Sequence, residues 1–367
     1  MTGTGNRLSL SAIACLLLLA IASRADSQTA PPPQRADIER QGRTEKTAFL
    51  IVDEGLNEPF AVDFDNTGRA FIAEMSGHRV SVLEANQTLH VLAGIGQPGL
   101  SGDDGPAAAA QLNGPHHLLV GPDGALYIAD TFNNVVRRVD LRTGIISRVA
   151  GTGDKGFGGD GGAAREAKFS GVFSIAFREG ALYICDLGNR RVRAVDLKTG
   201  IVTTVAGNGH QGVPIDGADA RTQPLVDPRA IAFDSAGNLY ICERAGHALR
   251  VIDRGGRIRT VAGTGEPGFA GDGGPALKGL LNGPKHIFVD RDDSVLITDT
   301  ENHVIRRYSP TDGTLSRVAG TGEKGLRGEG KNALQVQLNR PHGVHRHPRS
   351  GALYISDSEN HRILAIE

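Results

Sequence analysis

The chain has 367 residues, 50 of them glycine, no tryptophan and a formal net charge of −1. A chain this close to neutral has no general attraction to nucleic acid or anionic lipid, which excludes binding to either through net charge. Glycine and proline punctuate short apolar runs throughout, a pattern typical of all-β proteins built from strands and tight turns.

The N-terminal segment predicts export. Arg7 precedes an apolar stretch at residues 8–22, and the small residues Ser23 and Ala25 then fit a cleavage site. Residues 1–25 are therefore interpreted as a signal peptide, and the polar, proline-containing residues 26–45 as a disordered linker. We expect a secreted or periplasmic protein without stable membrane insertion, because no other apolar segment is long enough to span a bilayer.

One motif recurs six times from residue 72 onward. Its clearest copies are Ile-Thr-Asp-Thr-Glu-Asn-His at residues 297–303 and Ile-Ser-Asp-Ser-Glu-Asn-His at residues 355–361. The acids of the motif follow one another at a step of about 56 residues. They are Glu74, Asp130, Asp186, Glu243, Asp299 and Asp357. A repeat of this length is one supersecondary unit that buries its apolar faces only against its neighbours.

Each repeat predicts four antiparallel strands. In the second repeat, apolar or alternating runs at residues 117–120, 125–129, 135–140 and 145–150 are separated by short turns. Such a unit is one blade of a β-propeller. The last repeat stops after its third strand at residues 363–366, and an unmatched strand at residues 47–52 precedes the first blade. We therefore predict a six-bladed propeller at residues 46–367 in which the N-terminal strand completes the last blade.

Positions that repeat in every blade are interpreted as architecture. We expect the motif acids to accept backbone hydrogen bonds, and the arginines of the third strands to pair with acids at the blade edges. Those arginines are Arg137, Arg193, Arg250 and Arg306. Cys185 and Cys242 occupy a slot that is small in every blade, which predicts buried free thiols.

A Gly-rich segment with one carboxylate, such as Asp160 or Asp272, connects successive blades. We expect this acid to cap a short helix that follows it, and calcium binding is an alternative role for it. The segment lacks the strand, lysine and helix context of a phosphate-binding loop, so nucleotide binding is not predicted.

The repeated motif, most clearly Ile-Thr-Asp-Thr-Glu-Asn-His-Val-Ile-Arg-Arg at residues 297–307, resembles the NHL-repeat family. The Val-Ala-Gly-Thr-Gly connector at residues 261–265 is similar to that of secreted bacterial and teneurin-like NHL domains. The resemblance implies a six-bladed propeller. It does not imply one function, because the family includes RNA binders, protein binders, sensors and enzymes.

Residues that differ between blades are the candidates for function. The inner strands start around a central channel, and the residue after the turn proline, or its Gly171 equivalent, changes from blade to blade. This row reads Phe60, His116, Val172, Arg229, Lys285 and His342, and the next row includes His117, Phe173 and His286. Because side chains alternate along a strand, we expect only one row to face the channel and favour the first.

Two enzyme families are similar in fold. In the peptidyl-hydroxyglycine amidating lyase, zinc-binding histidines lie in Pro-His turns on alternate blades, which implies His116 and His342 as metal ligands here. The third position holds Arg229, which cannot ligate a metal. The gluconolactonase-like propellers use a metal held by carboxylates and amides, and the channel row contains no acid.

We therefore predict a non-enzymatic recognition scaffold, without an assigned cofactor, that binds a protein, peptide or small anionic ligand at the channel mouth. The predicted ligand-binding residues are His116, Arg229, Lys285, His342, Phe60, His117 and His286. The alternative is a lyase or lactonase-like hydrolase that uses zinc or calcium in the same channel. Closed propellers are often monomers, and we expect one here.

Overall fold

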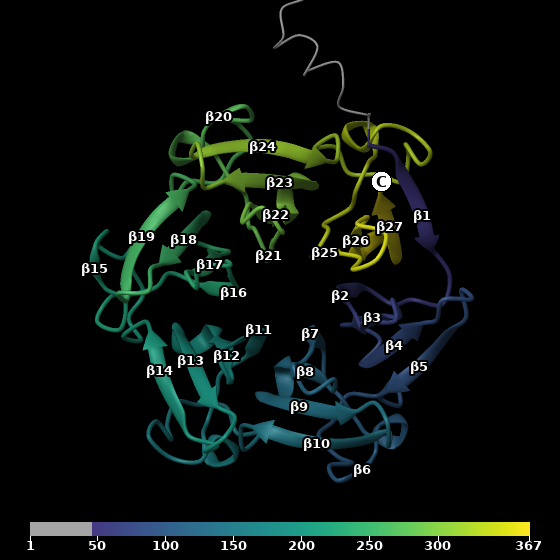
Figure 1. The fold of residues 1–367 in the computed structure, drawn as a ribbon, viewed down its shortest axis with the longest axis vertical. Helices are drawn as coiled ribbons and strands as arrows, with labels where there is room; N and C mark the ends of the chain where they lie inside the picture. Colours follow the sequence, from purple (N-terminus) through teal and green to yellow (C-terminus); the bar gives the residue numbers. More distant parts are fainter. Residues whose placement is uncertain (1–45) are drawn as a thin grey trace, which may run out of the picture. The chain divides into compact units, whose positions relative to one another are not determined.

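A computed structural model describes residues 46–367. The predicted signal peptide and linker, residues 1–45, lie outside the described residues. Six antiparallel sheets are arranged radially around a central opening, as Figure 1 shows for the ring of strands. Within the described residues, no helix has both the length and the apolar character needed to cross a membrane. The predicted all-β, six-bladed propeller is confirmed.

Each blade runs from an inner strand to an outer strand. Blade 1 contains β2 (Pro59–Phe64), β3 (Ala70–Glu74), β4 (Arg79–Leu83) and β5 (Leu89–Ala93). Blade 2 contains β7 (Pro115–Val120), β8 (Leu126–Asp130), β9 (Val135–Asp140) and β10 (Ile145–Ala150), with the short outer strand β6 (Gly105–Pro106). Blade 3 contains β11 (Val172–Arg178), β12 (Ala181–Asp186), β13 (Arg191–Asp196) and β14 (Val202–Ala206).

The second half of the ring repeats this plan. Blade 4 contains β16 (Pro228–Phe233), β17 (Leu239–Glu243), β18 (Ala248–Ile252) and β19 (Arg257–Ala262), with outer strand β15 (Ala218–Asp219). Blade 5 contains β21 (His286–Val289), β22 (Val295–Asp299), β23 (Val304–Ser309) and β24 (Thr314–Ala319), with outer strand β20 (Gly274–Pro275). Blade 6 contains β25 (Gly343–Arg346), β26 (Leu353–Asp357) and β27 (Arg362–Ile366).

Eight short 3₁₀ helices complete the secondary structure of residues 46–367. Four lie in connectors: η1 (Ala107–Ala109), η3 (Ala164–Glu166), η5 (Ala276–Lys278) and η7 (Ala333–Gln335). Four follow the motif acid: η2 (Thr131–Asn133), η4 (Leu187–Asn189), η6 (Thr300–Asn302) and η8 (Ser358–Asn360).

The N-terminal strand closes the ring. Strand β1 (Ala48–Val52) pairs antiparallel with β27, with Ala48 opposite Ile366 and Leu50 opposite Leu364. It is the outer strand of blade 6, so the two ends of the described chain share one sheet (Figure 1). The predicted closure is confirmed, and β27 gains a strand partner on the side that would otherwise be an exposed edge.

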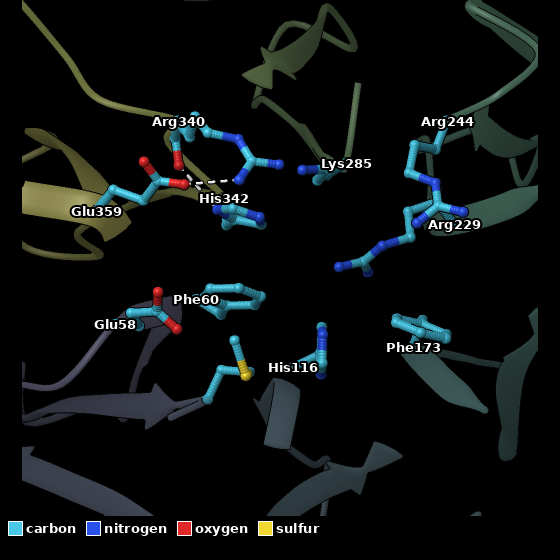
Figure 2. A pocket seen from close by; sticks show the side chains of 11 residues that line it. Glu58, Phe60, His116, Phe173, Arg229, Arg244, Lys285, Arg340, His342 and Glu359 are labelled. Carbon is cyan, nitrogen blue, oxygen red and sulfur yellow. Dashed lines mark hydrogen bonds and ion pairs between the residues drawn. The ribbon is translucent and has the colours of Figure 1, made fainter. Parts of the chain in front are cut away.

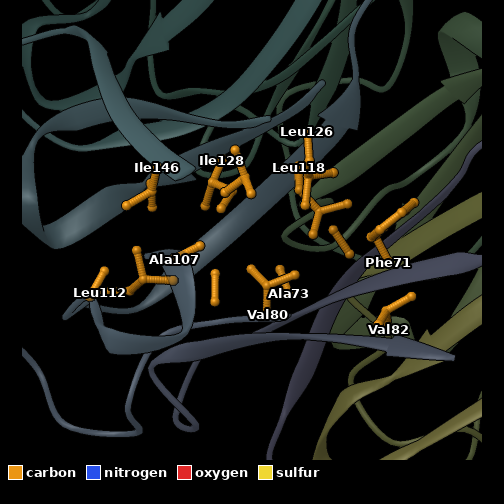
Figure 3. Close-up of a cluster of buried hydrophobic side chains, with 14 residues drawn as sticks. Phe71, Ala73, Val80, Val82, Ala107, Leu112, Leu118, Leu126, Ile128 and Ile146 are labelled. Carbon is orange, nitrogen blue, oxygen red and sulfur yellow. The ribbon is translucent and has the colours of Figure 1, made fainter. Parts of the chain in front are cut away.

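Apolar side chains pack between successive blades. In the cluster of Figure 3, Phe71 and Val80 of blade 1 pack with Leu126 and Ile128 of blade 2, and all four are fully buried. Leu112 from the connector closes one end of the same cluster. Burying a side chain of this size contributes about 1.5–3 kcal/mol, so the blades stabilise one another rather than fold alone.

The motif acids hold the turns of every blade. Each carboxylate accepts a hydrogen bond from a backbone N–H that lies before the inner strand of its own blade. For Asp299 this donor is Asn282 N, at 2.7 Å. Fully buried Arg306 lies 3.4 Å from the same carboxylate, donates to the Leu280 carbonyl, and pairs with Asp272 at 2.8 Å. The role predicted for the acids is confirmed. Arg137, Arg193 and Arg306 pair with connector acids as predicted, whereas Arg250 pairs with the motif acid Glu243 of its own blade.

The connector acids do not cap helices. The side chain of Asp160 accepts from Arg193 at 2.7 Å, and Asp272 accepts from Arg306. The 3₁₀ helices η1, η3 and η5 have no side-chain cap. That prediction was wrong because Asp160 and Asp272 pair with the buried guanidinium of their blades, which would otherwise lack a counter-charge, and Asp216 accepts from Thr260 instead. The same pairing makes these carboxylates poor calcium ligands.

The two cysteines are buried and free, as predicted. Burial raises the pKa of both thiols, because the thiolate would lose its hydration.

Candidate functional site

The inner strands bring unlike side chains to one mouth of the central channel. In blades 1, 2 and 4 the pairing register shifts at the residue after the turn proline, so Phe60, His116 and Arg229 each lie at a β-bulge. A bulge re-aims the side chain at the extra residue. The bulge after each turn proline thus directs these three side chains into the channel mouth.

The mouth is a cavity of about 230 Å³ (Figure 2). At about 30 Å³ per water molecule, this is the volume of roughly eight waters, which suits a small metabolite rather than a folded partner. The cavity is lined by Glu58, Phe60, Met75, His116, Phe173, Arg229, Arg244, Lys285, Arg340, His342 and Glu359. Five of the seven residues predicted for ligand binding are in this set. In blade 3, Phe173 lines the cavity instead of Val172 from the favoured row.

Arg229 is the most unusual residue of the cavity. It is 5% exposed, and its guanidinium lies over the ring of Phe173 at 4.4 Å from the centroid. Within residues 46–367 the guanidinium has no hydrogen-bond or ion-pair partner. Burial and the nearby Arg244 lower its pKa to about 10. A buried cation without a partner is costly, so this position is poised for an anion.

The other cations of the cavity already have partners. The Arg244 side chain pairs with Asp227 at 2.8 Å, and Lys285 Nζ lies 2.8 Å from Glu301 Oε1. Burial lowers the pKa of Lys285 to about 8, although Glu301 opposes the shift. Arg340 pairs with both Glu301 and Glu359.

Two neutral imidazoles present acceptors to the cavity. His116 Nδ1 lies 2.7 Å from the Gly114 carbonyl, and His342 Nδ1 lies 2.8 Å from the Arg340 carbonyl. A carbonyl only accepts, so each Nδ1 carries the proton and each Nε2 has a free lone pair. Burial lowers the pKa of both rings well below the ordinary value, and Arg229 and Lys285 add to the effect.

This tautomer, with Nε2 free, is one that metal-binding histidines adopt, but the donor set is incomplete. Phe60 packs against both rings, stacked on His342 at 3.8 Å and edge-on to His116 at 4.9 Å. The described part of the chain contains no group of three His, Cys, Asp or Glu side chains placed to hold a metal. Arg229 supplies a cation where a third imidazole would be needed. The residues at the mouth therefore do not fit a zinc or calcium centre.

His117 and His286 do not line the cavity, but they meet elsewhere. Their Nε2 atoms lie 3.0 Å apart, and both residues are buried. They belong to β7 and β21 of blades 2 and 5, whose inner ends lie on opposite sides of the central opening (Figure 1). The expectation that only one row faces the channel was wrong, because the bulge lets the consecutive residues His116 and His117 both point inward.

Comparison with known proteins identifies the repeat. The NHL repeat model matches residues 338–366. NHL repeat-containing protein 2 of Gallus gallus is 27% identical over 344 residues, which cover 84% of this chain and 46% of the relative. Teneurin-4 of Mus musculus is 28% identical over 173 residues, which cover 44% of this chain and 6% of the relative. The chain is an NHL-repeat six-bladed β-propeller. It spans less than half the length of the curated relatives it matches.

Solved structures share the fold of this NHL propeller. An auxiliary nutrient binding protein from Bacteroides ovatus ATCC 8483 has a TM-score of 0.63 at 16% identity, covering 88% of this chain and 72% of that chain. A gluconolactonase from Xanthomonas campestris has a TM-score of 0.57 at 14% identity, covering 88% and 89% of the two chains. At these identities the likeness concerns the fold alone.

Several residues at the mouth of the NHL propeller were missed by sequence reasoning, although a signal was present. Glu58 and Arg340 precede the turn proline, where blades 2 and 5 have glycine. Met75 and Arg244 follow the motif acid, where blades 2 and 5 have threonine. Departures from the repeat at these two positions mark the cavity as clearly as the inner-strand row does.

Proposed function

We propose that this propeller is a non-enzymatic binding protein whose channel mouth captures a small anionic ligand, with Arg229 as the principal anion-binding residue. The observation that supports the proposal is the buried guanidinium of Arg229, which faces the cavity without a partner (Figure 2). Its planar fork of N–H donors matches a carboxylate, which accepts two parallel hydrogen bonds.

The positively charged groups beside Arg229 are already oriented for an anion. Lys285 Nζ and the Arg244 side chain are held in place by Glu301 and Asp227, so the anion enters a site whose positive groups are already oriented. The ring of Phe173 packs against one face of the guanidinium and leaves its edge for the ligand. Solved propellers of similar fold include nutrient-binding proteins, a class with which a small-ligand site is consistent.

The test is calorimetric titration with small carboxylates, such as acetate and butyrate, and with phosphate. We expect a carboxylate to bind, and Arg229→Gln to weaken that binding by about tenfold or more, since hydrogen bonds to a charged group contribute about 1.5–3 kcal/mol. Arg221→Gln is the matched control, because it removes the same charge from an exposed residue paired with Asp219. If no anion binds, or if both variants behave alike, the proposal is wrong.

A second test measures the thermal stability of the ligand-free protein. Arg229→Met should raise the melting temperature of the ligand-free protein, because an apolar chain of similar length replaces a buried, unpaired charge. The same variant should abolish anion binding. A variant that is less stable than the parent would mean that Arg229 is satisfied within the protein and would contradict the proposed role.

The alternative function is a metal-dependent lyase or lactonase-like hydrolase at the same mouth. The proton on Nδ1 of His116 and of His342 favours it, because each Nε2 is left free to ligate. The donor set does not, because Arg229 stands in the third position. Metal analysis of the purified protein separates the two functions. Stoichiometric zinc or calcium that is lost in His116→Ala would favour the enzyme.

We also propose that the protein is exported to the periplasm or the medium, on the strength of the apolar stretch and the small residues at 23 and 25. N-terminal sequencing of the exported protein should give Asp26 as the first residue. Retention of the full-length chain in the cytoplasm would contradict this prediction.

A further inference from the structure

Six charged residues line the cavity at the channel mouth, and only two of them lack an ion pair among the described residues. Arg244, Lys285, Arg340 and Glu359 each pair with an opposite charge. The unpaired pair is Arg229 and Glu58. One free positive and one free negative charge therefore face the same small cavity.

Glu58 is partly exposed and lines the cavity without an ion-pair partner among the described residues. Its backbone N–H donates to His361 Nδ1 at 3.1 Å, and its side-chain Oε2 accepts from the Ser76 hydroxyl. Its φ of 50° places it in the left-handed region at the turn before β2. The Ser76 hydroxyl fixes the position of the carboxylate without neutralising its charge, since a hydroxyl is neutral.

The two free charges lie on different walls of the cavity. Figure 2 shows Glu58 on the side of blades 1 and 6 and Arg229 on the opposite side, with Phe60 and His116 between them. They are not within ion-pair distance of each other. A ligand that satisfies both must itself carry a positive and a negative group at a separation.

The groups between the two charges suit an ammonium end and a short carbon chain. The free Nε2 atoms of His116 and His342 accept N–H donors, and both rings stay neutral because burial lowers their pKa. The rings of Phe60 and Phe173 and the side chain of Met75 give the cavity apolar surface. An anion alone would leave Glu58 and both imidazole acceptors unused.

Resting on the proposed function of the mouth, we propose that its ligand class is a small aminocarboxylate zwitterion. The carboxylate binds Arg229, and the ammonium binds Glu58 with the imidazole acceptors beside it. Because the two charges lie on opposite walls, a chain that separates the ammonium from the carboxylate, as in 4-aminobutyrate or glycylglycine, fits better than glycine does.

The experiment compares two ligands that differ only in the ammonium group. Calorimetric titration should show 4-aminobutyrate binding about tenfold or more tighter than butyrate. Glu58→Gln should weaken 4-aminobutyrate binding by about tenfold and so remove this preference, whereas Arg229→Gln should weaken both ligands. Glu166→Gln, a change of the same charge at an exposed residue, should behave as the parent. A thermal melt of each variant checks that it is folded.

The outcomes separate this inference from the function on which it rests. If both ligands bind equally, or if Glu58→Gln keeps the preference, the zwitterion is wrong and a plain carboxylate site remains. If 4-hydroxybutyrate binds as tightly as 4-aminobutyrate, the ligand is recognised by a hydroxyl donor and the role of the Glu58 charge is overturned. If none of these compounds binds, the anion site itself is wrong, and the zwitterion with it.

Discussion

The buried imidazole pair makes a contribution to stability that we predict is lost in mild acid. Burial, together with His345 and Arg229, lowers the pKa of His117 from 6.5 to about 3. The same burial lowers the pKa of His286, whose Nε2 lies 3.0 Å from that of His117. Unfolding exposes both rings to water and restores their ordinary pKa.

The sign and size follow from the linkage between protonation and folding. Between pH 6.5 and about 3, the unfolded chain binds a proton at His117 that the folded protein does not. The contribution of His117 to the free energy of unfolding therefore falls as the pH falls through this range and is restored at neutral pH. One pKa unit corresponds to about 1.4 kcal/mol, so at pH 5 His117 alone lowers the free energy of unfolding by about 2 kcal/mol.

Buried carboxyl groups act in the opposite direction, so the comparison must be made between variants. Burial raises the pKa of Asp130 to about 7, and its contribution to stability is present at low pH and lost as the pH rises through that value. His117→Gln leaves Asp130 in place and removes only the titrating ring. The glutamine amide can still hydrogen-bond to His286.

The assay is urea unfolding at pH 7.5, 6.0 and 5.0, followed by circular dichroism. Between the highest and the lowest pH, the parent should lose about 2 kcal/mol more stability than His117→Gln. His210→Gln, a change at an exposed histidine, should follow the parent at every pH. Parallel curves for the parent and His117→Gln would refute the reasoning, because they would show that His117 titrates alike in the folded and unfolded states.

Three further predictions concern the architecture. Arg306→Met should lower the free energy of unfolding by about 3–5 kcal/mol in urea titrations, because it leaves the buried Asp299 carboxylate without its cation; a loss below 1 kcal/mol would contradict this. Removing residues 46–52, which include β1, should expose β27 and convert the monomer expected from size-exclusion chromatography into aggregates with a lower melting temperature; an unchanged elution profile and melting curve would show that the ring does not need this strand. Cys185 and Cys242 should react with a thiol reagent only after denaturation, since both are buried and their thiols have raised pKa values; rapid labelling of the native protein would show that these sites open.

Much of the ring could be predicted because its determinants are local and periodic. The motif acid fixes the turn after the second strand of every blade, and a step of about 56 residues between acids leaves room for four strands and one connector. The missing fourth strand of the last blade and the extra strand at the N-terminus then imply closure. Arg229, Lys285 and His342 were placed at the mouth for the same reason, since equivalent residues of equivalent blades face one axis.

The features of the channel mouth that the sequence did not predict depend on contacts between residues that are distant in sequence. The bulge at His116 lets His117 also turn inward, and a bulge of this kind leaves no signature in the alternation of side chains. The sequence also did not predict that Arg229 lacks an ion-pair partner among the described residues. Asp227 lies two residues away and would be its natural partner, but its carboxylate is bound by Arg244 instead. Only the three-dimensional arrangement shows that the guanidinium is left free.

Paired charges stabilise the ring, and unpaired charges line the ligand site. At repeated positions, each buried charge meets a partner from its own blade, as Arg306 meets Asp299 and Asp272, so the ring is stable whatever its mouth contains. The two unpaired charges that line the cavity, Arg229 and Glu58, lie at positions where the blades differ. Replacing Arg229 or Glu58 by another residue would change what the cavity binds while leaving every blade-stabilising pair intact. Ligand preference can therefore change between propellers of this kind without a change in fold, which is why a similar fold at low identity does not transfer a substrate.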